Sequence, residues 1–193
     1  MQLRAYRVRF LIRLVSSDPS REDFLSSVRS LAKSLGAEAR NPKWTSRRAL
    51  ELDIFVPTRA DFELLLSIIR PLYAIEFTRD LNVAPPHVSD KEAVAEARRY
   101  FNSERFWECH EVLEGLWRQK KGDEKLLLQG AILVCAAFVH HQKGEDPVAL
   151  GVLRRAISAL DVPVPNYRGI DVQLLRGNAD RILKSETFEC FSI

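Results

Sequence analysis

A histidine and a glutamate spaced four residues apart are the side chains in this sequence best suited to chemistry. His110 and Glu114 lie in the segment 106–118, whose apolar residues recur with the period of a helix. Residues i and i+4 of a helix face the same way, one turn apart. The pair suits a divalent metal ion, with one nitrogen and one oxygen ligand. It equally suits an acid–base pair, because a carboxylate fixes the tautomer of a histidine and raises its basicity.

Two interpretations without chemistry account for the same residues. Glu114 lies four residues before Arg118, so these two side chains can form an exposed ion pair. His110 lies at the edge of an apolar arc and is equally explained as a half-buried, hydrogen-bonded histidine. The apolar arc consists of Phe106, Cys109, Val112, Leu113 and Leu116, and the opposite side of the helix is predicted to carry Glu108, Glu111 and Arg118.

The next helix along the chain supplies a further polar group. Helices are predicted over 105–120 and 123–142, and the short turn between them makes them antiparallel neighbours. Residues equally far from that turn lie level with each other. This places Gln129 within reach of both His110 and Glu114.

These three side chains and the Trp117 indole are expected to form a small polar network in an otherwise apolar bundle. We expect the indole N–H of Trp117 to have a buried partner, and Glu111 to join only if its side chain turns inward. A catalytic zinc ion normally has three protein ligands, whereas here two good ligands converge with an amide. A weakly bound divalent metal ion or a metal-free polar pocket is therefore favoured over a tight zinc centre, and no catalytic residue is assigned.

Two other polar residues are expected to pair with each other, away from His110. His140 lies eight residues beyond the position that is level with His110, about 12 Å at 1.5 Å per residue. It is level with Asn102 instead, so we predict a separate contact between these two side chains.

Other side chains of these helices are predicted to be structural. Trp107 is expected to pack in the core, and Cys135 is expected to be an inert core thiol. The segment 123–142 is apolar on all sides, which predicts the central helix of a bundle. Gly130 in this segment permits close approach of a neighbouring helix.

The first eighty residues alternate between strand and helix patterns. Alternating and apolar segments predict strands over 6–14, 38–45, 48–56 and 73–79. Ser20 and Thr58 are placed to cap two intervening helices, and Gly36 is placed to end the first of them. The resulting order, βαββαβ, is that of a ferredoxin-like, split-βαβ sandwich.

The pattern becomes helical throughout after the short, stiff stretch Asn82–Pro86. Helices are predicted over 90–103, 105–120, 123–142, 146–160 and 171–185. We therefore predict an α+β protein in three parts, namely a ferredoxin-like sandwich over 1–81, a linker over 82–89 and an all-α five-helix bundle over 90–193.

Composition and charge exclude several classes of protein. The chain is 46% apolar and 28% charged, which is typical of a globular protein. Its net charge of +3 is too small to attract a polyanion to the whole molecule. Arginines interrupt the apolar residues at the start, so no secretory signal is predicted. The run 126–139 is shorter than the roughly 20 residues of a membrane span, so no membrane partner is expected.

Three cysteines without a CxxC pair indicate a reducing cytoplasm rather than a disulfide scaffold. The excess of arginine over lysine and the single methionine hint at a thermophilic source. The glycines form neither G-x-G-x-x-G nor G-x-x-x-x-G-K-[ST], so the common nucleotide-binding loops are excluded.

The basic first strand raises the question of nucleic-acid binding. The open face of the sheet is predicted to carry Arg7, Arg9 and Arg13 together with Glu51, Asp53 and Glu76. Opposite charges across strands stabilise a sheet, whereas an RNA-binding sheet needs aromatic rings on that face. Phe55 alone is suitable, so a ladder of charge pairs is favoured over a nucleic-acid surface.

The segment around His110 closely resembles an uncharacterised bacterial and archaeal family, the domain of unknown function 309. The matching residues are Asn102, Phe106, Trp107, Glu108, His110, Glu111, Leu113, Glu114, Trp117 and Arg118. The resemblance covers roughly residues 95–175 and continues through Leu128–Gly130, the run ending at His140, and Tyr167–Asp171. It implies a helical protein without an established activity, whose HxxxExxW motif has been suggested to bind metal. Leu133 and Glu145 depart from the family pattern, and the first removes a polar group from the site.

Three hypotheses follow. In the first, the helical region binds a metal ion or a small molecule at His110 and Glu114, with or without catalysis. In the second, the motif specifies packing of the bundle, and the sandwich domain mediates dimerisation or partner binding. In the third, the basic first domain associates with nucleic acid. No partner is identified, and a homo-oligomer is left open.

Overall fold

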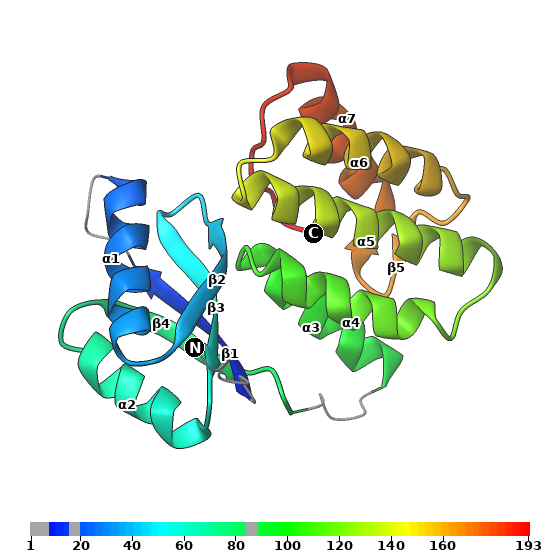
Figure 1. The fold of residues 1–193 in the computed structure, drawn as a ribbon. Coiled ribbons are helices and arrows are strands. Elements are labelled where there is room, and N and C mark those ends of the chain that lie inside the picture. The colour runs from blue at the N-terminus through cyan, green and yellow to red at the C-terminus, as the bar shows by residue number, and fades with distance from the viewer. Residues whose placement is uncertain (1–7, 16–19, 84–88) are drawn as a thin grey trace. The chain divides into compact units, whose positions relative to one another are not determined.

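The computed structural model describes residues 8–15, 20–83 and 89–193 (Figure 1). The chain divides into two compact units, Met1–Pro86 and His87–Ile193. Arg7 of the predicted charge ladder and residues 84–88 of the predicted linker lie outside the described residues. Each unit is described by itself below.

The N-terminal unit follows the predicted order of strands and helices. Its elements are β1 (Val8–Val15), α1 (Arg21–Ser34), β2 (Glu38–Trp44), β3 (Ala49–Val56), α2 (Arg59–Ile69) and β4 (Ala74–Asp80). The strands form one antiparallel sheet in the order β2-β3-β1-β4. The first strand therefore lies inside the sheet, between β3 and β4, as predicted.

One face of this sheet shares a hydrophobic core with both helices. Strand alternation places Phe10, Ile12 and Leu14 of β1 on this face, and all three are buried. Phe24 of α1 and Phe62 of α2 pack against them. The rings of Phe10 and Phe62 stack with centroids 3.8 Å apart, which fixes α2 on the sheet.

Local capping determines where the helices begin and end. The Ser20 hydroxyl accepts a hydrogen bond from the Asp23 amide at 3.2 Å. Thr58 and Asp61 form a reciprocal capping box at the start of α2. Gly36 has a φ of 74° just after α1, a left-handed conformation that glycine adopts without a steric penalty.

The other face of the sheet carries the predicted ladder of charge pairs. Arg9 Nη2 donates to Asp53 Oδ2 at 2.6 Å, and Arg13 Nη2 donates to Glu51 Oε2 at 3.0 Å. Lys43 of β2 forms an ion pair with the other oxygen of Glu51. The side chains of Arg13, Lys43 and Glu51 are each at most 5% exposed, so the Glu51 carboxylate compensates two cations away from water.

The aromatic ring on this face is also engaged by cations. The guanidinium carbons of Arg9 and Arg40 lie 5.6 Å and 4.8 Å from the centroid of the Phe55 ring. The last predicted member of the charge ladder, Glu76, has its carboxylate 3.8 Å from the Arg13 guanidinium. Phe55 is therefore covered by arginines rather than open for base stacking.

Over residues 89–193, the C-terminal unit contains five helices and a short hairpin. The helices are α3 (Asp90–Asn102), α4 (Phe106–Trp117), α5 (Gly122–Gln142), α6 (Asp146–Ala159) and α7 (Val172–Ser185). They agree with the predicted helices to within three residues at each end. The hairpin, formed by β5 (Asn166–Tyr167) and β6 (Ile170–Asp171), is absent from the prediction because two-residue strands produce no periodicity.

Helix α5 is the central element of this unit, as its apolar sequence predicts. It packs against α4 on one side and α6 on the other (Figure 1). A Cβ atom built on Gly130 would lie 2.5 Å from Leu160 Cγ and 3.1 Å from the Leu160 backbone nitrogen. A side chain at residue 130 would therefore have to displace Leu160, which agrees with the predicted close approach at this glycine.

Aromatic rings close the core of the helical unit. Phe106 lies 5.0 Å from Phe101 and 4.5 Å from Phe138, measured between centroids. From the segment after α7, Phe188 and Phe191 pack on Phe138 at 5.4 Å and 5.7 Å. The segment that follows the last helix is therefore part of the core.

The protein is thus mixed α/β, with a four-stranded antiparallel sheet and its helices followed by a helical region. Within the described ranges, no helix combines the length and the apolar character that crossing a bilayer requires.

Candidate functional site

Helix α4 positions the candidate site. Its buried side consists of apolar residues with helical spacing, among them Cys109, Leu113 and Leu116. These residues hold α4 against its neighbours, since full burial of a large aliphatic side chain contributes about 1.5–3 kcal/mol. His110 and Glu114 lie beside this stripe and are both half-buried.

Three potential metal ligands converge along this edge of α4. One ligand atom from each of His110, Glu111 and Glu114 lies within 4.8 Å of the other two. The His110 side chain is 21% exposed, that of Glu114 33% and that of Glu111 50%. The cluster is therefore open to solvent on one side.

Neighbouring side chains orient the members of this cluster. His110 Nδ1 lies 3.3 Å from Glu111 Oε1, and the Trp107 ring stacks on the imidazole with centroids 5.4 Å apart and planes within 6°. Arg118 Nη2 donates to Glu114 Oε1 at 3.0 Å, which is the ion pair predicted from their spacing. The Arg118 side chain is 68% exposed, so this pair is weak and easily displaced.

The polar side of α4 differs from the prediction at one residue, Glu108. Glu111 lies on the polar side as the helical wheel predicts, and its carboxylate turns toward the neighbouring imidazole. Glu108, predicted on the same polar side, is 1% exposed. Arg105, just before α4, donates to Glu108 Oε1 at 2.8 Å and 2.6 Å, and this cation compensates for burial of the carboxylate.

The tryptophans correct two further predictions. Trp107 is not in the core but is 38% exposed, because it covers His110 rather than the interior. The predicted buried partner of Trp117 is also wrong, since its Nε1 atom is buried and has no hydrogen-bond acceptor among the described residues. Lys125 Nζ lies 4.2 Å from the centroid of the Trp117 ring instead, in a cation–π contact.

The predicted four-member polar network is therefore replaced by local pairs on α4. Gln129 is half-buried on α5, and in the part of the chain that the structure describes no hydrogen bond joins its amide to His110 or Glu114. The structure brings together His110, Glu111 and Glu114, and gives Trp117 a lysine as its neighbour.

Asn102 and His140 have other partners than each other. Asn102 Oδ1 accepts a hydrogen bond from the Ile193 amide at 3.0 Å, which fastens the segment after α7 to α3. His140 Nδ1 lies 2.5 Å from Glu145 Oε2 across the turn between α5 and α6. This hydrogen bond lowers the pKa of the Glu145 carboxyl. The predicted contact between Asn102 and His140 is wrong, because each residue serves a local turn or terminus.

Two thiols lie behind the candidate ligands. Cys135 Sγ lies 3.2 Å from Cys109 Sγ, and both residues are buried. Burial raises the pKa of the Cys109 thiol well above its usual range. This agrees with the prediction of a core environment for Cys135.

A second polar cluster is one that sequence reasoning missed. Lys120 pairs with Asp90, and Arg168 Nη2 lies 3.4 Å from the same carboxylate. Tyr167 donates to Glu124 Oε1 at 2.6 Å, and burial followed by this hydrogen bond raises the pKa of Tyr167 to about 12. The cluster ties the β5–β6 hairpin to the ends of three helices. Its signal in the sequence is the Tyr167–Asp171 stretch of the family resemblance.

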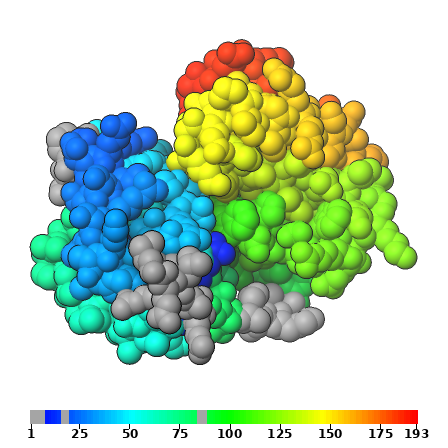
Figure 2. Space-filling model, viewed as in Figure 1, coloured from blue at the N-terminus to red at the C-terminus, as the bar shows by residue number. Residues whose placement is uncertain are grey.

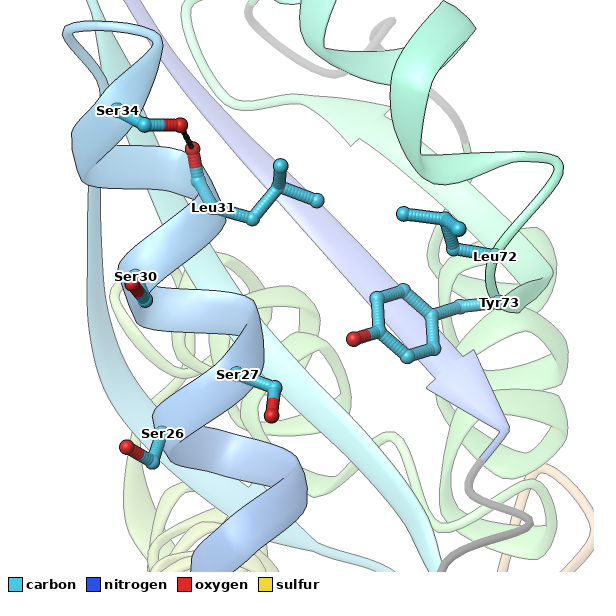
Figure 3. A pocket seen from close by; sticks show the side chains of 7 residues that line it. All are labelled: Ser26, Ser27, Ser30, Leu31, Ser34, Leu72 and Tyr73. Carbon is cyan, nitrogen blue, oxygen red and sulfur yellow. Dashed lines mark hydrogen bonds between the residues drawn. The ribbon is translucent and has the colours of Figure 1, made fainter.

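A hollow in the N-terminal unit is a separate feature. It has a volume of about 580 Å³ and is lined by Ser26, Ser27, Ser30, Leu31, Ser34, Leu72 and Tyr73. Figure 3 shows the serines along α1 and the Tyr73 hydroxyl directed toward that helix, and α1 lies at the surface of its unit in Figure 2. Its lining offers no acid, imidazole or thiol, so the cluster on α4 remains the better candidate for chemistry.

The donor set on α4 fits a divalent metal ion. One imidazole nitrogen and two carboxylate oxygens are ligands that Zn²⁺, Mn²⁺ and Fe²⁺ accept. Ligand atoms that are each about 2.1 Å from one ion lie at most about 4.2 Å apart. The present spread of 4.8 Å therefore needs only a small inward shift, for which the exposed Glu111 has the freedom.

Comparison with known proteins gives relatives for the helical region. The family model described as domain of unknown function (DUF309) matches residues 94–152. An uncharacterised protein of Aquifex aeolicus (strain VF5) is 26% identical over 95 residues, which is 49% of this chain and 28% of that protein. The chain thus spans a little over a quarter of the length of this relative.

A solved structure is also similar to this chain. It is the crystal structure of a conserved hypothetical protein from Thermus thermophilus, which is 36% identical. The match covers 51% of this chain and 99% of that protein, with a TM-score of 0.43. The family model and the HxxxExxW motif on α4 agree, so the helical region around residues 94–152 belongs to the DUF309 family.

Proposed function

We propose that the helical unit binds a divalent transition-metal ion at His110, Glu111 and Glu114. The observation that carries the proposal is the convergence of three donor atoms within 4.8 Å on one edge of α4. Two of the three donors are carboxylates. The exposed Arg118 offsets part of their negative charge, and a metal ion bound between them would offset more of it.

The surroundings support a weak and exchangeable site. All three ligands come from two turns of a single helix, and Glu111 is half exposed. Trp107 restricts the imidazole by stacking on it, while Arg118 holds one oxygen of Glu114. A bound ion with three protein ligands leaves further coordination positions for water or for an oxygen-bearing small molecule.

Isothermal titration of the full chain with Zn²⁺ and with Mn²⁺ tests this proposal. Wild-type protein should bind one ion per chain. His110→Ala and Glu114→Gln should each weaken binding at least about tenfold, since even groups that only support a ligand contribute this much. Circular dichroism and thermal unfolding should show both variants folded.

His141→Ala is the matched control. His141 is also partly exposed and lies 2.7 Å from one carboxylate, that of Asp146, but among the described residues it belongs to no cluster of three ligands. Its removal should leave metal binding unchanged. Binding that is equal in wild type and His110→Ala would refute the site. A loss of several kcal/mol of unfolding free energy in His110→Ala would favour the packing hypothesis instead.

We also propose the finer description of the fold. The antiparallel order β2-β3-β1-β4 with both helices on one face supports a ferredoxin-like sandwich. The packing of α5 between α4 and α6 supports a five-helix bundle. The proposed location is the cytoplasm, in keeping with buried cysteines that form no disulfide among the described residues.

A further inference from the structure

Two buried thiols face each other across the interface between α4 and α5. The sulfur atoms of Cys109 and Cys135 lie 3.2 Å apart, with the Cys135 thiol donating to the Cys109 sulfur. Their side chains are 0% and 1% exposed. The two residues are far apart in the sequence, so it is the antiparallel packing of the helices that brings their side chains together.

The distance between the two sulfur atoms is short enough for a disulfide bond to form between them with little movement. A disulfide has an S–S length of about 2.05 Å, so the sulfurs need to approach by only about 1 Å. The backbones of α4 and α5 are held by extensive packing on both sides of the pair. Rotation of the two side chains, rather than movement of a helix, therefore closes the gap.

We propose that Cys109 and Cys135 are an oxidation site, at which a hydroperoxide converts the thiol pair into an intramolecular disulfide. When the pair is transiently open to water, one thiol loses its proton and its sulfur attacks a peroxide oxygen. The O–O bond breaks, the sulfur becomes a sulfenic acid, and the leaving oxygen takes up the proton as an alcohol or, from hydrogen peroxide, as water. The second sulfur then displaces hydroxide from the sulfenic acid and forms the S–S bond. With hydrogen peroxide, the two thiol protons end in two water molecules, and the two electrons reduce the peroxide.

The cross-link acts on the part of α4 that carries the candidate ligands. Cys109 directly precedes His110 in the chain, and Cys135 lies on the helix that supports α4. The disulfide therefore fastens the turn holding His110 to the central helix α5. Formation of the disulfide does not depend on the proposed metal site, and it is tested with chelator present.

Because both sulfurs are buried, the rate of their oxidation depends on how often the pair becomes accessible to peroxide. Peroxide reaches them only when α4 separates briefly from α5, because neither side chain is open to solvent. Cys190 is exposed in the segment after α7, so it reacts first and is replaced by serine in the experiment. The reaction of the buried pair should accelerate steeply as the temperature approaches the unfolding transition.

The test uses the full chain carrying Cys190→Ser, treated with hydrogen peroxide in the presence of EDTA below its unfolding temperature. Its intact mass should fall by two hydrogen atoms. Trypsin should then release residues 106–118 joined to residues 126–143, a pair that dithiothreitol separates. The same protein with Cys135→Ala should show neither change.

Thermal unfolding provides a second measurement. A cross-link that closes a loop of this length should raise the midpoint of the helical unit by on the order of 10 °C, and dithiothreitol should reverse the shift. The proposal is overturned if both thiols gain oxygen atoms without losing hydrogen, or if they stay reduced while exposed thiols in the same solution are consumed.

Discussion

On the charged face of the sheet the carboxylates are buried against cations, whereas on α4 two carboxylates converge on one imidazole at the surface and the cation beside them, Arg118, is exposed. Glu51 lies between Arg13 and Lys43, and all three side chains are at most 5% exposed. Glu111 and Glu114 converge with His110 at the surface. Both clusters bring charged side chains together, but the sheet cluster pairs cations with a carboxylate, whereas the α4 cluster brings two carboxylates together.

This difference separates a structural cluster from a candidate binding site. Buried charges are tolerated only when partners compensate them. Glu51 compensates Arg13 and Lys43, and Glu76 lies 3.8 Å from Arg13 as well, so this group needs no ligand. The α4 group carries like charges and remains in contact with water, which leaves room for a cation. The comparison predicts that mutations on the sheet act on stability and mutations on α4 act on binding.

Glu51→Gln should have the largest effect on stability. It removes the buried carboxylate that Arg13 and Lys43 share, and breaking a buried ion pair costs about 3–5 kcal/mol. Urea unfolding monitored by circular dichroism measures the loss. Replacing Glu38, an exposed member of an ion pair on β2, by Gln should cost less than about 1 kcal/mol. Equal losses of stability in the two variants would contradict the expectation that buried ion pairs of the sheet contribute more than exposed ones.

Asp53→Asn should have an intermediate effect. Asp53 accepts hydrogen bonds from Arg9 and from Asn41, each at 2.6 Å, but the Arg9 side chain is 39% exposed. Water can replace part of the hydrogen bonding that the Arg9 guanidinium loses with the Asp53 carboxylate. We therefore expect the free energy of unfolding to fall by about 1–3 kcal/mol in the same urea experiment. A cost as large as that of Glu51→Gln would show that exposure of the cation has no influence.

Arg118→Ala should change binding and leave stability nearly constant. It removes the cation that holds Glu114 Oε1, so metal affinity should rise about two- to fivefold while unfolding free energy changes by less than about 0.5 kcal/mol. Titration calorimetry measures the affinity. Arg99→Ala is the control, since Arg99 forms a similar exposed pair with Glu96 on α3. Weaker binding in Arg118→Ala would argue against Glu114 as a ligand.

The exposed pair between His140 and Glu145 should give the smallest effect, visible only in acid. The pKa of Glu145 is lowered in the folded state by its hydrogen bond to His140. Its contribution to stability is therefore complete above the unfolded pKa and disappears as the pH falls through the lower, folded pKa. Glu145→Gln should lower the thermal midpoint near neutral pH and match wild type in strong acid. Glu189→Gln, at an exposed glutamate after α7, should show no such convergence.

Much of the architecture could be predicted because it depends on periodicity. Apolar residues at every second position determine which face of β1 is buried. The antiparallel register then places Arg9 opposite Phe55, so that its side chain reaches Asp53 on the same face of β3. The five helices follow from apolar residues at helical spacing. The hairpin at Tyr167 could not be predicted, since it is held by contacts with distant helices.

The candidate site was less predictable than the fold. A helical wheel locates Cα positions, and on that basis Glu111 lies on the polar side of α4, away from the flank that carries Glu114 and Trp117. Three rotatable bonds let the glutamate reach back, which the wheel does not describe. Glu108 lies on the same polar side but is buried, because Arg105 precedes it and supplies the compensating charge. Side-chain pairing, rather than position on the wheel, determines where these carboxylates lie.

The interior position of β1 has a consequence for synthesis of the chain. Its partners β3 and β4 both come later in the sequence, so a nascent chain that ends before Asp80 exposes one unpaired edge of a strongly apolar strand. Such an edge is a template for intermolecular pairing. The helical unit is built mainly from neighbouring helices joined by short turns, and over residues 89–193 its strands are only two residues long, so it should be less prone to aggregate during translation.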